Sequence, residues 1–296
     1  MNPEVFPVVF TDLDGTLLDH YTYSFAAARE ALDLLRRRHI PLILCSSKTR
    51  AELELLQLDL RVGRHPLISE NGGGIFVPRG YFPFAMKEAR PALGYEVIEF
   101  GLPYFRLVES LHRAAQAQRV RVVGFSDLSV EEIAAECGLS LLEARLAKLR
   151  DYDEPFRVLD ADPSARSHLL TALHRAGLRC TRGGRYHHLT GRNDKGRAVR
   201  ALKALYQKAG HRVLAIGLGD GLNDLPMLRE MDVPIVVPNP AAGSTARLLR
   251  KVPTAQLAPA PGPLGWNLAL PAVLGARAKG TDQPTPVEPS RESHVT

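Results

Sequence analysis

Carboxylates stand in pairs at two places in this chain. Asp12 and Asp14 follow one short apolar run, and Asp220 and Asp224 follow another. In an extended backbone the side chains of residues i and i+2 share a face, so Asp12 and Asp14 can point into one site. Carboxylates held close together repel, so one must be protonated or they must hold a cation. Oxygen ligands of this kind suit Mg²⁺, which is usually bound by one or two carboxylates together with substrate phosphate.

Hydroxyl and ammonium groups stand at two further positions of the same kind. Ser46 and Ser47 end an apolar run, where a hydroxyl and backbone amides suit phosphate oxygens. Lys195 stands at an expected helix start, where its charge could stabilise a phosphoryl group and an aspartyl nucleophile. Each motif alone is also an ordinary turn or helix cap, because Asp, Ser and Gly favour both. Their joint occurrence at strand ends and helix starts predicts one shared site.

Apolar segments of strand length must position these groups. The runs 5–13, 40–47 and 211–221 each end at one of the motifs, and 24–38 and 49–60 have helical spacing. Strands that are apolar on both faces and alternate with helices predict a parallel sheet of βαβ units. Ligands bind such α/β sheets beyond the carboxyl ends of the strands, which is where the motifs lie.

The alternating pattern is interrupted in the middle of the chain. Between 84 and 189, strands and helices do not alternate singly, which predicts a smaller α+β unit inserted into the first fold. We therefore predict a core split into residues 1–83 and 190–275, with residues 84–189 as a cap. Residues 276–296 contain no Leu, Ile or aromatic residue, and such a segment is expected to be a disordered tail.

The composition excludes several classes of protein. Of 296 residues, 45% are hydrophobic and 24% charged, which is too apolar for a disordered chain. No apolar run approaches the ~20 residues of a membrane span, and the N-terminus lacks a secretory signal, so a cytoplasmic protein is expected. Cys45, Cys137 and Cys180 lie far apart without a CxxC motif, so neither a zinc site nor a disulfide framework is expected. We interpret Cys45, inside an apolar strand, as a small buried hydrophobe and not as a nucleophile.

The net charge of +6 allows two kinds of partner, a nucleic acid or a small anionic substrate. The densest basic run, Arg36–Arg38, stands at an expected helix C-terminus, where positive charge complements the helix dipole and faces water. We therefore expect a small anionic substrate, with neither a nucleic-acid nor a membrane partner. The sequence indicates no oligomeric state.

Four motifs together identify a family resemblance. DLDGT (12–16), the strand end at Ser46, Lys195 and GDGLND (219–224) resemble, in this order, the motifs of the haloacid dehalogenase-like (HAD) phosphatase superfamily. The resemblance covers residues 5–240, with an insertion between the second and third motifs. It implies a doubly wound, Rossmann-like parallel-sheet core, an inserted α+β cap, and Mg²⁺-dependent hydrolysis of a phosphate monoester through an aspartyl-phosphate.

The resemblance also implies roles for individual residues. Asp12 corresponds to the nucleophile, and Asp14 to the general acid that later acts as base. Ser46 and Lys195 correspond to the residues that hold the phosphoryl group. The metal ligands that it implies are Asp12, Asp14 through its backbone carbonyl, and Asp220, with Asp224 in a supporting position.

Three further segments narrow the resemblance. SSKTRAE (46–52), ENGGGIF (70–76) and RGGRYHHL (182–189) are similar to those of mannosyl-3-phosphoglycerate phosphatases. That family releases phosphate to leave mannosylglycerate, a compatible solute, from a phosphorylated sugar-glycerate substrate. The substrate-binding residues that follow are Ser47, Lys48, Thr49 and Arg50 near the reaction centre, Asn71, Gly72 and Gly73 in the glycine turn, and Arg182, Arg185 and His187 on the cap.

Other interpretations stay open at the level of sequence. The same scaffold suits a phosphatase or phosphomutase for another sugar phosphate, for example glucosyl-3-phosphoglycerate. A non-catalytic anion- or RNA-binding protein is a further alternative, and the four intact motifs count against it. Glycines 72–74 can simply permit a hairpin turn. His187 and His188 lack metal-ligand spacing, and ordinary polar strand residues are the favoured interpretation for both.

Overall fold

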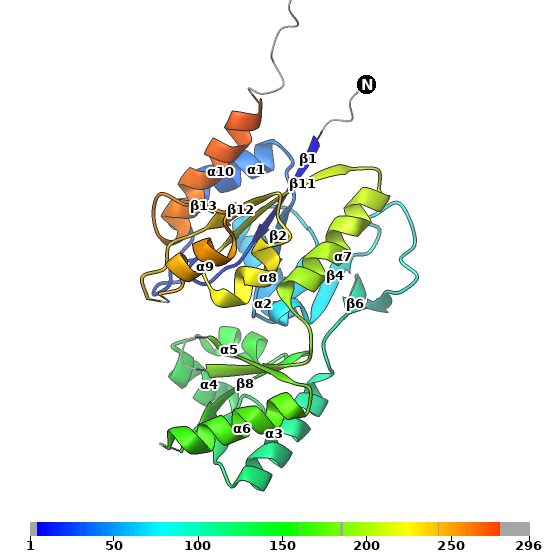
Figure 1. Ribbon diagram of the computed structural model, residues 1–296. Coiled ribbons are helices and arrows are strands. Elements are labelled where there is room, and N and C mark those ends of the chain that lie inside the picture. The colour runs from blue at the N-terminus through cyan, green and yellow to red at the C-terminus, as the bar shows by residue number, and fades with distance from the viewer. Residues whose placement is uncertain (1–4, 161, 184–185, 242, 279–296) are drawn as a thin grey trace, which may run out of the picture.

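The computed structural model describes residues 5–160, 162–183, 186–241 and 243–278 of the chain. Within these residues the strands form two sheets, one in each half of the molecule (Figure 1). The larger sheet has the strand order β13-β12-β11-β1-β2-β3-β4-β6-β5, and the smaller has the order β7-β8-β10-β9. The chain leaves the larger sheet after β6, builds the smaller sheet, and returns as β11, so the smaller unit is an insertion.

The larger sheet is parallel through its first six strands and antiparallel beyond them. The parallel strands are short apolar segments because helices cover both of their faces. They are β1 (Val5–Thr11), β2 (Leu42–Cys45), β3 (Leu67–Ser69), β11 (Arg212–Gly219), β12 (Val233–Val236) and β13 (Gln256–Leu257). The antiparallel extension is β4 (Gly74–Pro78), β6 (Tyr95–Glu99) and β5 (Arg90–Ala92).

Helices lie on both faces of the larger sheet, which confirms the predicted doubly wound α/β core. On one face, Leu32, Leu53 and Trp266 pack together from three different helices. On the other face, Leu202 and Met227 belong to a second buried cluster. The first face carries α1 (Arg29–Arg37), α2 (Arg50–Leu60) and α10 (Gly262–Ala278), and the second carries α7 (Lys195–Lys208), α8 (Leu225–Leu228) and α9 (Thr245–Lys251).

The inserted unit is an α+β cap whose smaller sheet has helices on both sides. Two of its helices pack over one face and enclose Phe156 and Leu189. The other two pack against Phe125 on the opposite side, and of these α5 lies nearest the core in Figure 1. The elements are α3 (Tyr104–Gln118), β7 (Val122–Gly124), α4 (Val130–Cys137), α5 (Leu141–Ala147), β8 (Asp153–Val158), α6 (Pro163–Arg175), β9 (Arg179–Gly183) and β10 (Tyr186–Thr190).

The predicted boundaries need correction at two points. The cap does not begin at residue 84, because β5 and β6 pair with β4 and extend the core sheet to Glu99. Local alternation identifies a strand but not the sheet that it joins, so the sequence misplaced this boundary. The predicted tail does not begin at 276, because α10 continues to Ala278. Residues 279–296 lie outside the described residues.

Several helices also differ from their predicted form. The segment 24–38 is not one continuous α-helix, because it begins as the short 3₁₀ helix η1 (Ala26–Ala28) before α1, where the Ser24 hydroxyl accepts the Ala26 N–H. Helices α3, α6, α9 and α10 were not predicted. Among the described residues, no helix combines the length and apolar character needed to cross a bilayer.

Candidate active site

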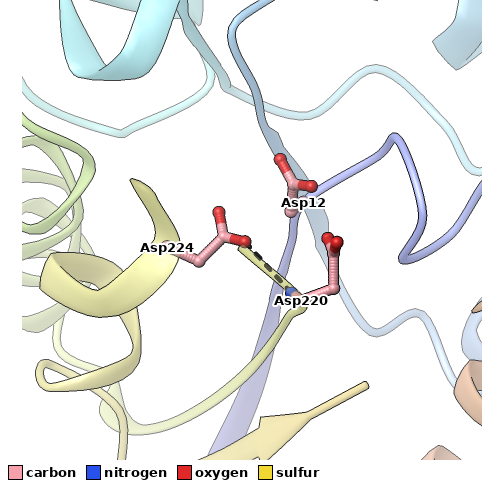
Figure 2. Close-up of side chains that lie close together, drawn as sticks. All are labelled: Asp12, Asp220 and Asp224. Atoms are coloured by element: carbon pink, nitrogen blue, oxygen red, sulfur yellow. Dashed lines mark hydrogen bonds between the residues drawn. The ribbon is translucent and has the colours of Figure 1, made fainter. Parts of the chain in front are cut away.

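Three carboxylates converge at the carboxyl edge of the parallel sheet. Asp12 directly follows β1, and Asp220 directly follows the neighbouring strand β11. Asp224 ends the 3₁₀ helix η3 (Leu222–Asp224), one turn further on. Figure 2 shows the three side chains gathered around one space, and one oxygen of each lies within 4.8 Å of the others. All three are buried, so the fold places a concentrated negative charge where water is scarce.

Hydrogen bonds fix the orientation of two of these carboxylates. Asp224 Oδ2 accepts the backbone N–H of Asp220 at 3.1 Å (Figure 2). It also accepts the backbone N–H of Gly221, at 2.9 Å. The Asp220 carboxylate accepts the Thr16 hydroxyl at 2.7 Å and Asn239 Nδ2 at 2.6 Å. Each oxygen of Asp220 uses one lone-pair direction in this way, so its other lone pair is available to a ligand in the centre.

Gly15, Asn239 and Ser244 complete this support. Gly15 has φ +85°, and a Cβ there would lie 2.5 Å from Asn239 Nδ2, so this close approach requires glycine. The Ser244 hydroxyl donates to the Asp220 carbonyl. Neither Asn239 nor Ser244 was predicted from the sequence. Asn239 follows β12, and its place after a parallel strand is the signal that could have identified it.

Lys195, the first residue of α7, joins two of the carboxylates. Its Nζ donates to Asp12 Oδ1 at 2.5 Å and to Asp224 Oδ1 at 2.6 Å, and its side chain is fully buried. Burial by itself would lower the pKa of Lys195, but the two carboxylates outweigh burial and hold the pKa above its usual value. Lys195 is therefore a fixed ammonium charge within the cluster.

The charge of this cluster fits a divalent cation. Three carboxylates against one ammonium leave a net charge of −2. Burial and the charge of Asp224 raise the pKa of Asp12, and the same two causes raise the pKa of Asp220. A cation among the carboxylates would relieve this repulsion, and three convergent oxygen ligands suit a hard ion.

Asp14 lies beside the cluster and not within it. Its carboxylate Oδ1 is 3.2 Å from Lys48 Nζ, which also lies 3.9 Å from Glu52 Oε1 and above the ring of Tyr23. The contribution of Asp14 to a metal site through its backbone carbonyl stays a prediction. The position of its carboxylate, two residues beyond Asp12 and outside the three clustered side chains, leaves it available for proton transfer.

The segment Ser46–Lys48, here called the phosphate loop, follows β2 next to this cluster. The Ser46 backbone N–H donates to the Ile68 carbonyl at 3.1 Å, and its hydroxyl accepts the Lys48 N–H at 3.3 Å. The Ser47 carbonyl accepts Arg150 Nη1 from the cap at 2.8 Å. Cys45, just before the loop, is buried, and burial raises its pKa to about 12, as expected for a thiol that is not a nucleophile.

Two residues predicted to bind substrate have other partners. Thr49 is the N-cap of α2, and its hydroxyl accepts the Glu52 N–H and donates to the Leu146 carbonyl of the cap. Arg50 pairs with Glu54 one turn along α2 and lies over the ring of Phe76. Helix capping therefore uses the Thr49 hydroxyl, and i,i+4 pairing uses one nitrogen of Arg50, while the assignment of both residues to a substrate stays a prediction.

Groups of the glycine turn also form hydrogen bonds within the chain. It contains the 3₁₀ helix η2 (Glu70–Gly72), which ends at Gly72. The Asn71 backbone N–H donates to the Ser46 carbonyl at 2.9 Å, and its side-chain amide donates to Asp153 at 3.3 Å. The Gly73 N–H donates to the carbonyls of residues 69 and 70. The predicted substrate donors of Asn71 and Gly73 are thus occupied within the chain.

The cap histidines point to opposite faces of its sheet. The ring of His187 lies 5.4 Å from that of Phe156, on the side of α3 and α6, which is remote from the core in Figure 1. His188, the next residue, faces the other way, and its Nδ1 is 3.0 Å from Asp153. His187 therefore lies on the face of the cap sheet that is turned away from the core, and its assignment to the substrate stays a prediction. Arg182 pairs with His187 across the sheet, and Arg185 lies outside the described residues.

Removing the support of Asp220 should weaken metal binding. Thr16→Val keeps the shape of a buried side chain but deletes the hydroxyl that orients Asp220, so the divalent-cation concentration that half-saturates the site should rise about 10- to 100-fold. Thr190→Val, at a buried threonine on β10, is the matched control and should leave this concentration unchanged. Calorimetric titration with a divalent cation measures both, and equal values for wild type and Thr16→Val would contradict the prediction.

Glu70 predicts a pH dependence of stability. Burial raises the pKa of its carboxyl from 4.5 to about 8, despite the neighbouring Arg150 charge. Because the folded-state pKa exceeds the unfolded one, this contribution to stability is complete below the unfolded pKa and is lost as pH rises through about 8. Between pH 4.5 and about pH 8, the free energy of unfolding of wild type should therefore fall relative to that of Glu70→Gln. Urea unfolding with Mg²⁺ present tests this, and a constant difference would contradict it.

Comparisons with known proteins agree with this geometry. Residues 9–86 match the family model of the haloacid dehalogenase-like hydrolases. A Methanococcoides burtonii protein named glucosyl-3-phosphoglycerate/mannosyl-3-phosphoglycerate phosphatase is 46% identical over 90% of this chain and 97% of its own length. A protein of the same name from Persephonella marina is 37% identical over 92% of this chain and 99% of its own. The crystal structure of Thermoplasma acidophilum 0175 superimposes with a TM-score of 0.62 at 18% identity, over 89% of this chain and 96% of that one.

Proposed function

Because this chain belongs to the haloacid dehalogenase-like hydrolases, within the family of the glucosyl-3-phosphoglycerate/mannosyl-3-phosphoglycerate phosphatases, we propose that it hydrolyses the phosphate monoester of these two sugar-glycerate phosphates. The chain is a phosphoric monoester hydrolase. The products are inorganic phosphate and the sugar glycerate, which is mannosylglycerate or glucosylglycerate. Mannosylglycerate is a compatible solute.

One observation carries the assignment of the chemistry. Lys195 bridges Asp12 and Asp224 inside a cluster of net charge −2, with Asp220 completing it. An ion pair with a purely structural role would need no third carboxylate. Burying a third carboxylate without a counter-ion is unfavourable. The arrangement is therefore suited to a ligand that carries both a divalent cation and a phosphoryl group.

We assign the chemical steps to two aspartates. Asp12 attacks phosphorus in line, and a covalent aspartyl-phosphate forms as the P–O bond to the substrate breaks. Asp14 donates a proton to the leaving oxygen and then takes one from the water that hydrolyses the intermediate. Ser46 and Lys195 bind the non-bridging phosphoryl oxygens, and the rigid hold on Lys195 keeps its charge in place throughout.

The metal that we propose is Mg²⁺. The residues that would hold it are Asp12, Asp220 and the backbone carbonyl of Asp14, with Asp224 supporting the site through Asp220 and Lys195. When bound, Mg²⁺ neutralises negative charge on the nucleophile and the phosphate and so favours their approach.

We propose that Lys48 and Ser47 meet the glycerate carboxylate. Lys48 Nζ lies beside Asp14, where the leaving oxygen must be protonated, and in this substrate only two carbon atoms, C3 and C2, separate that oxygen from the glycerate carboxylate. Burial lowers the pKa of Lys48, but the charges of Asp14 and Glu52 outweigh burial and hold the pKa above its usual value. Lys48 therefore carries a positive charge. A small anionic substrate also accounts for the basic composition without a nucleic-acid or membrane partner, and it is consistent with a cytoplasmic enzyme.

A substrate panel tests the proposal. Phosphate release should be fastest with mannosyl-3-phosphoglycerate or glucosyl-3-phosphoglycerate, slower with glucose 6-phosphate and 3-phosphoglycerate, and lost in EDTA. A hexose phosphate as the best substrate would overturn the substrate assignment while leaving the phosphatase assignment standing. Transfer of phosphate to a second sugar without net release would indicate a phosphomutase, and salt-sensitive RNA binding without hydrolysis would indicate the non-catalytic alternative.

A further inference from the structure

Residues Glu70–Gly73, here called the hinge block, touch both segments that connect core and cap. The Gly73 carbonyl accepts the N–H groups of Phe100, at 2.8 Å, and Gly101, at 2.9 Å, where the chain leaves the core. The Asn193 side-chain amide donates to the Glu70 carbonyl at 3.3 Å, where the chain returns. The hinge block thus lies at the position where any motion of the cap must pivot.

The hinge block also holds the nearest cap segment. The Glu70 carboxylate accepts the Asp151 N–H at 3.0 Å and the Tyr152 N–H, just before β8 begins. A Cβ on Gly73 would lie 2.4 Å from Tyr152 Cβ, so glycine at this position allows Tyr152 to pack directly against the backbone of the hinge block. Asn71 Nδ2 adds a bond to Asp153 in β8. The cap is therefore attached to the hinge block by one carboxylate and one amide.

The hinge block also anchors the phosphate loop through backbone hydrogen bonds. The Glu70 N–H donates to the Lys48 carbonyl at 3.0 Å, and the Asn71 N–H donates to the Ser46 carbonyl at 2.9 Å. Between these two bonds, the Ser47 carbonyl accepts Arg150 Nη1 from the cap. All three backbone carbonyls of the loop are thus held by groups that belong to the hinge or to the cap.

The backbone of the hinge block is strained to make these contacts. Glu70 has φ +48° and Asn71 has φ +55°, which is the left-handed region that L residues other than glycine rarely adopt. Such strain persists only where surrounding contacts over-determine it, and it concentrates at functional sites. Glu70 is fully buried, and burial raises its pKa, so the ionised form of this carboxyl group is disfavoured at this position.

We propose that Glu70 and Arg150 are positioning residues that couple closure of the cap to placement of the phosphate loop. With the cap seated, Glu70 binds the amides of the cap segment, and Arg150 reaches the Ser47 carbonyl. When the cap swings away to admit substrate, these cap contacts are lost, and one anchor of the loop is lost with them. Binding energy between a substrate and the cap is in this way spent on orienting the loop.

This inference rests on the proposed function, in which the sugar contacts the cap and the phosphate contacts the loop. Glu70→Gln and Arg150→Lys should each lower kcat with mannosyl-3-phosphoglycerate about 10- to 100-fold, the effect of a small misplacement of a reacting group. Hydrolysis of p-nitrophenyl phosphate, which is too small to draw on the cap, should change less than about twofold by the same argument. Arg150→Lys retains the charge but loses the planar guanidinium fork.

Glu154→Gln is the matched control for Glu70→Gln. Glu154 is also a fully buried glutamate of the cap boundary, but it accepts the Tyr104 hydroxyl and the Ser126 N–H and hydroxyl, all within the cap. This variant should lose stability while keeping the wild-type ratio of activity on the large and small substrates. An equal fall of this ratio in Glu154→Gln, or an unchanged ratio in Glu70→Gln, would overturn the proposal.

Amide hydrogen exchange tests the coupling independently of any substrate. Glu70→Gln and Arg150→Lys should both raise exchange in residues 46–48 and in 151–152 together, whereas Glu154→Gln should raise neither. Faster exchange in 151–152 with an unchanged loop would show that Glu70 only fastens the cap, and it would overturn the coupling. A wild type that fails to hydrolyse the sugar-glycerate phosphates would refute the proposed function, and this exchange experiment would still decide the coupling.

Discussion

Asp12→Asn is expected to abolish phosphate release, with a loss of about 10⁴-fold or more in kcat, as removal of a catalytic nucleophile produces. An amide is a much weaker nucleophile than a carboxylate, and it cannot form the proposed aspartyl-phosphate. The side chains are nearly isosteric, so the site should keep its shape. Burial and the charge of Asp224 raise the pKa of Asp12, and loss of this charge should therefore leave the metal-free protein at least as stable.

Two measurements separate this effect from general damage. Steady-state phosphate release gives kcat, and thermal unfolding in EDTA reports whether Asp12→Asn retains the wild-type fold. Asp59→Asn, at an exposed position of α2, changes the same charge away from the site and should keep full activity. Turnover by Asp12→Asn within about tenfold of wild type, far short of a nucleophile deletion, would refute the assignment of Asp12.

Lys195→Met is expected to cost both stability and activity. It leaves Asp12, Asp220 and Asp224 buried without their ammonium partner, and breaking a buried pair in this way typically costs about 3–5 kcal/mol. Loss of a fixed positive charge at the phosphoryl group should lower kcat about 10²- to 10³-fold, as for one transition-state donor. Urea unfolding in EDTA measures the first effect, and phosphate release with Mg²⁺ measures the second.

The response to added Mg²⁺ tests whether the uncompensated charge of the carboxylates causes the instability of Lys195→Met. A divalent cation among the three carboxylates replaces the lost charge, so Mg²⁺ should stabilise Lys195→Met more than wild type. Lys208→Met, on the exposed end of the same helix, should alter neither stability in EDTA nor the response to Mg²⁺. Equal stabilisation of Lys195→Met and wild type by Mg²⁺ would show that Lys195 does not offset the charge of the carboxylates.

The core of the site was predictable from sequence because its information is local. Asp12, Ser46 and Asp220 each follow an apolar run of strand length, and parallel strands bring their carboxyl ends to one edge. Hydrophobic runs alternating with helical spacing were enough to predict a parallel sheet of βαβ units, and the family resemblance implied its doubly wound form. Lys195 stands at a helix start in sequence and in structure, and the burial of its side chain among carboxylates follows from where α7 packs.

The cap residues were harder to assign because their roles depend on register. His187 and His188 differ by one position, and pairing with β8 decides which of them faces α3 and α6. Thr49 is chemically suited to bind an anion, but the start of α2 uses its hydroxyl as a cap. A residue type indicates what a side chain can do, whereas its neighbours in space decide which of those interactions is already satisfied.

The sequence by itself determined the chemistry of this protein: acidic, hydroxyl and ammonium groups at strand ends, in an order that identifies a phosphatase. Those features are encoded in segments of about ten residues, where apolar runs and turn residues suffice. Only the tertiary structure decided which sheet β5 and β6 join, that Asn239 orients Asp220, and that Glu70 holds the cap. Contacts between residues 19 to 81 positions apart depend on packing of the whole chain, because no local pattern specifies which partner a buried polar group will find.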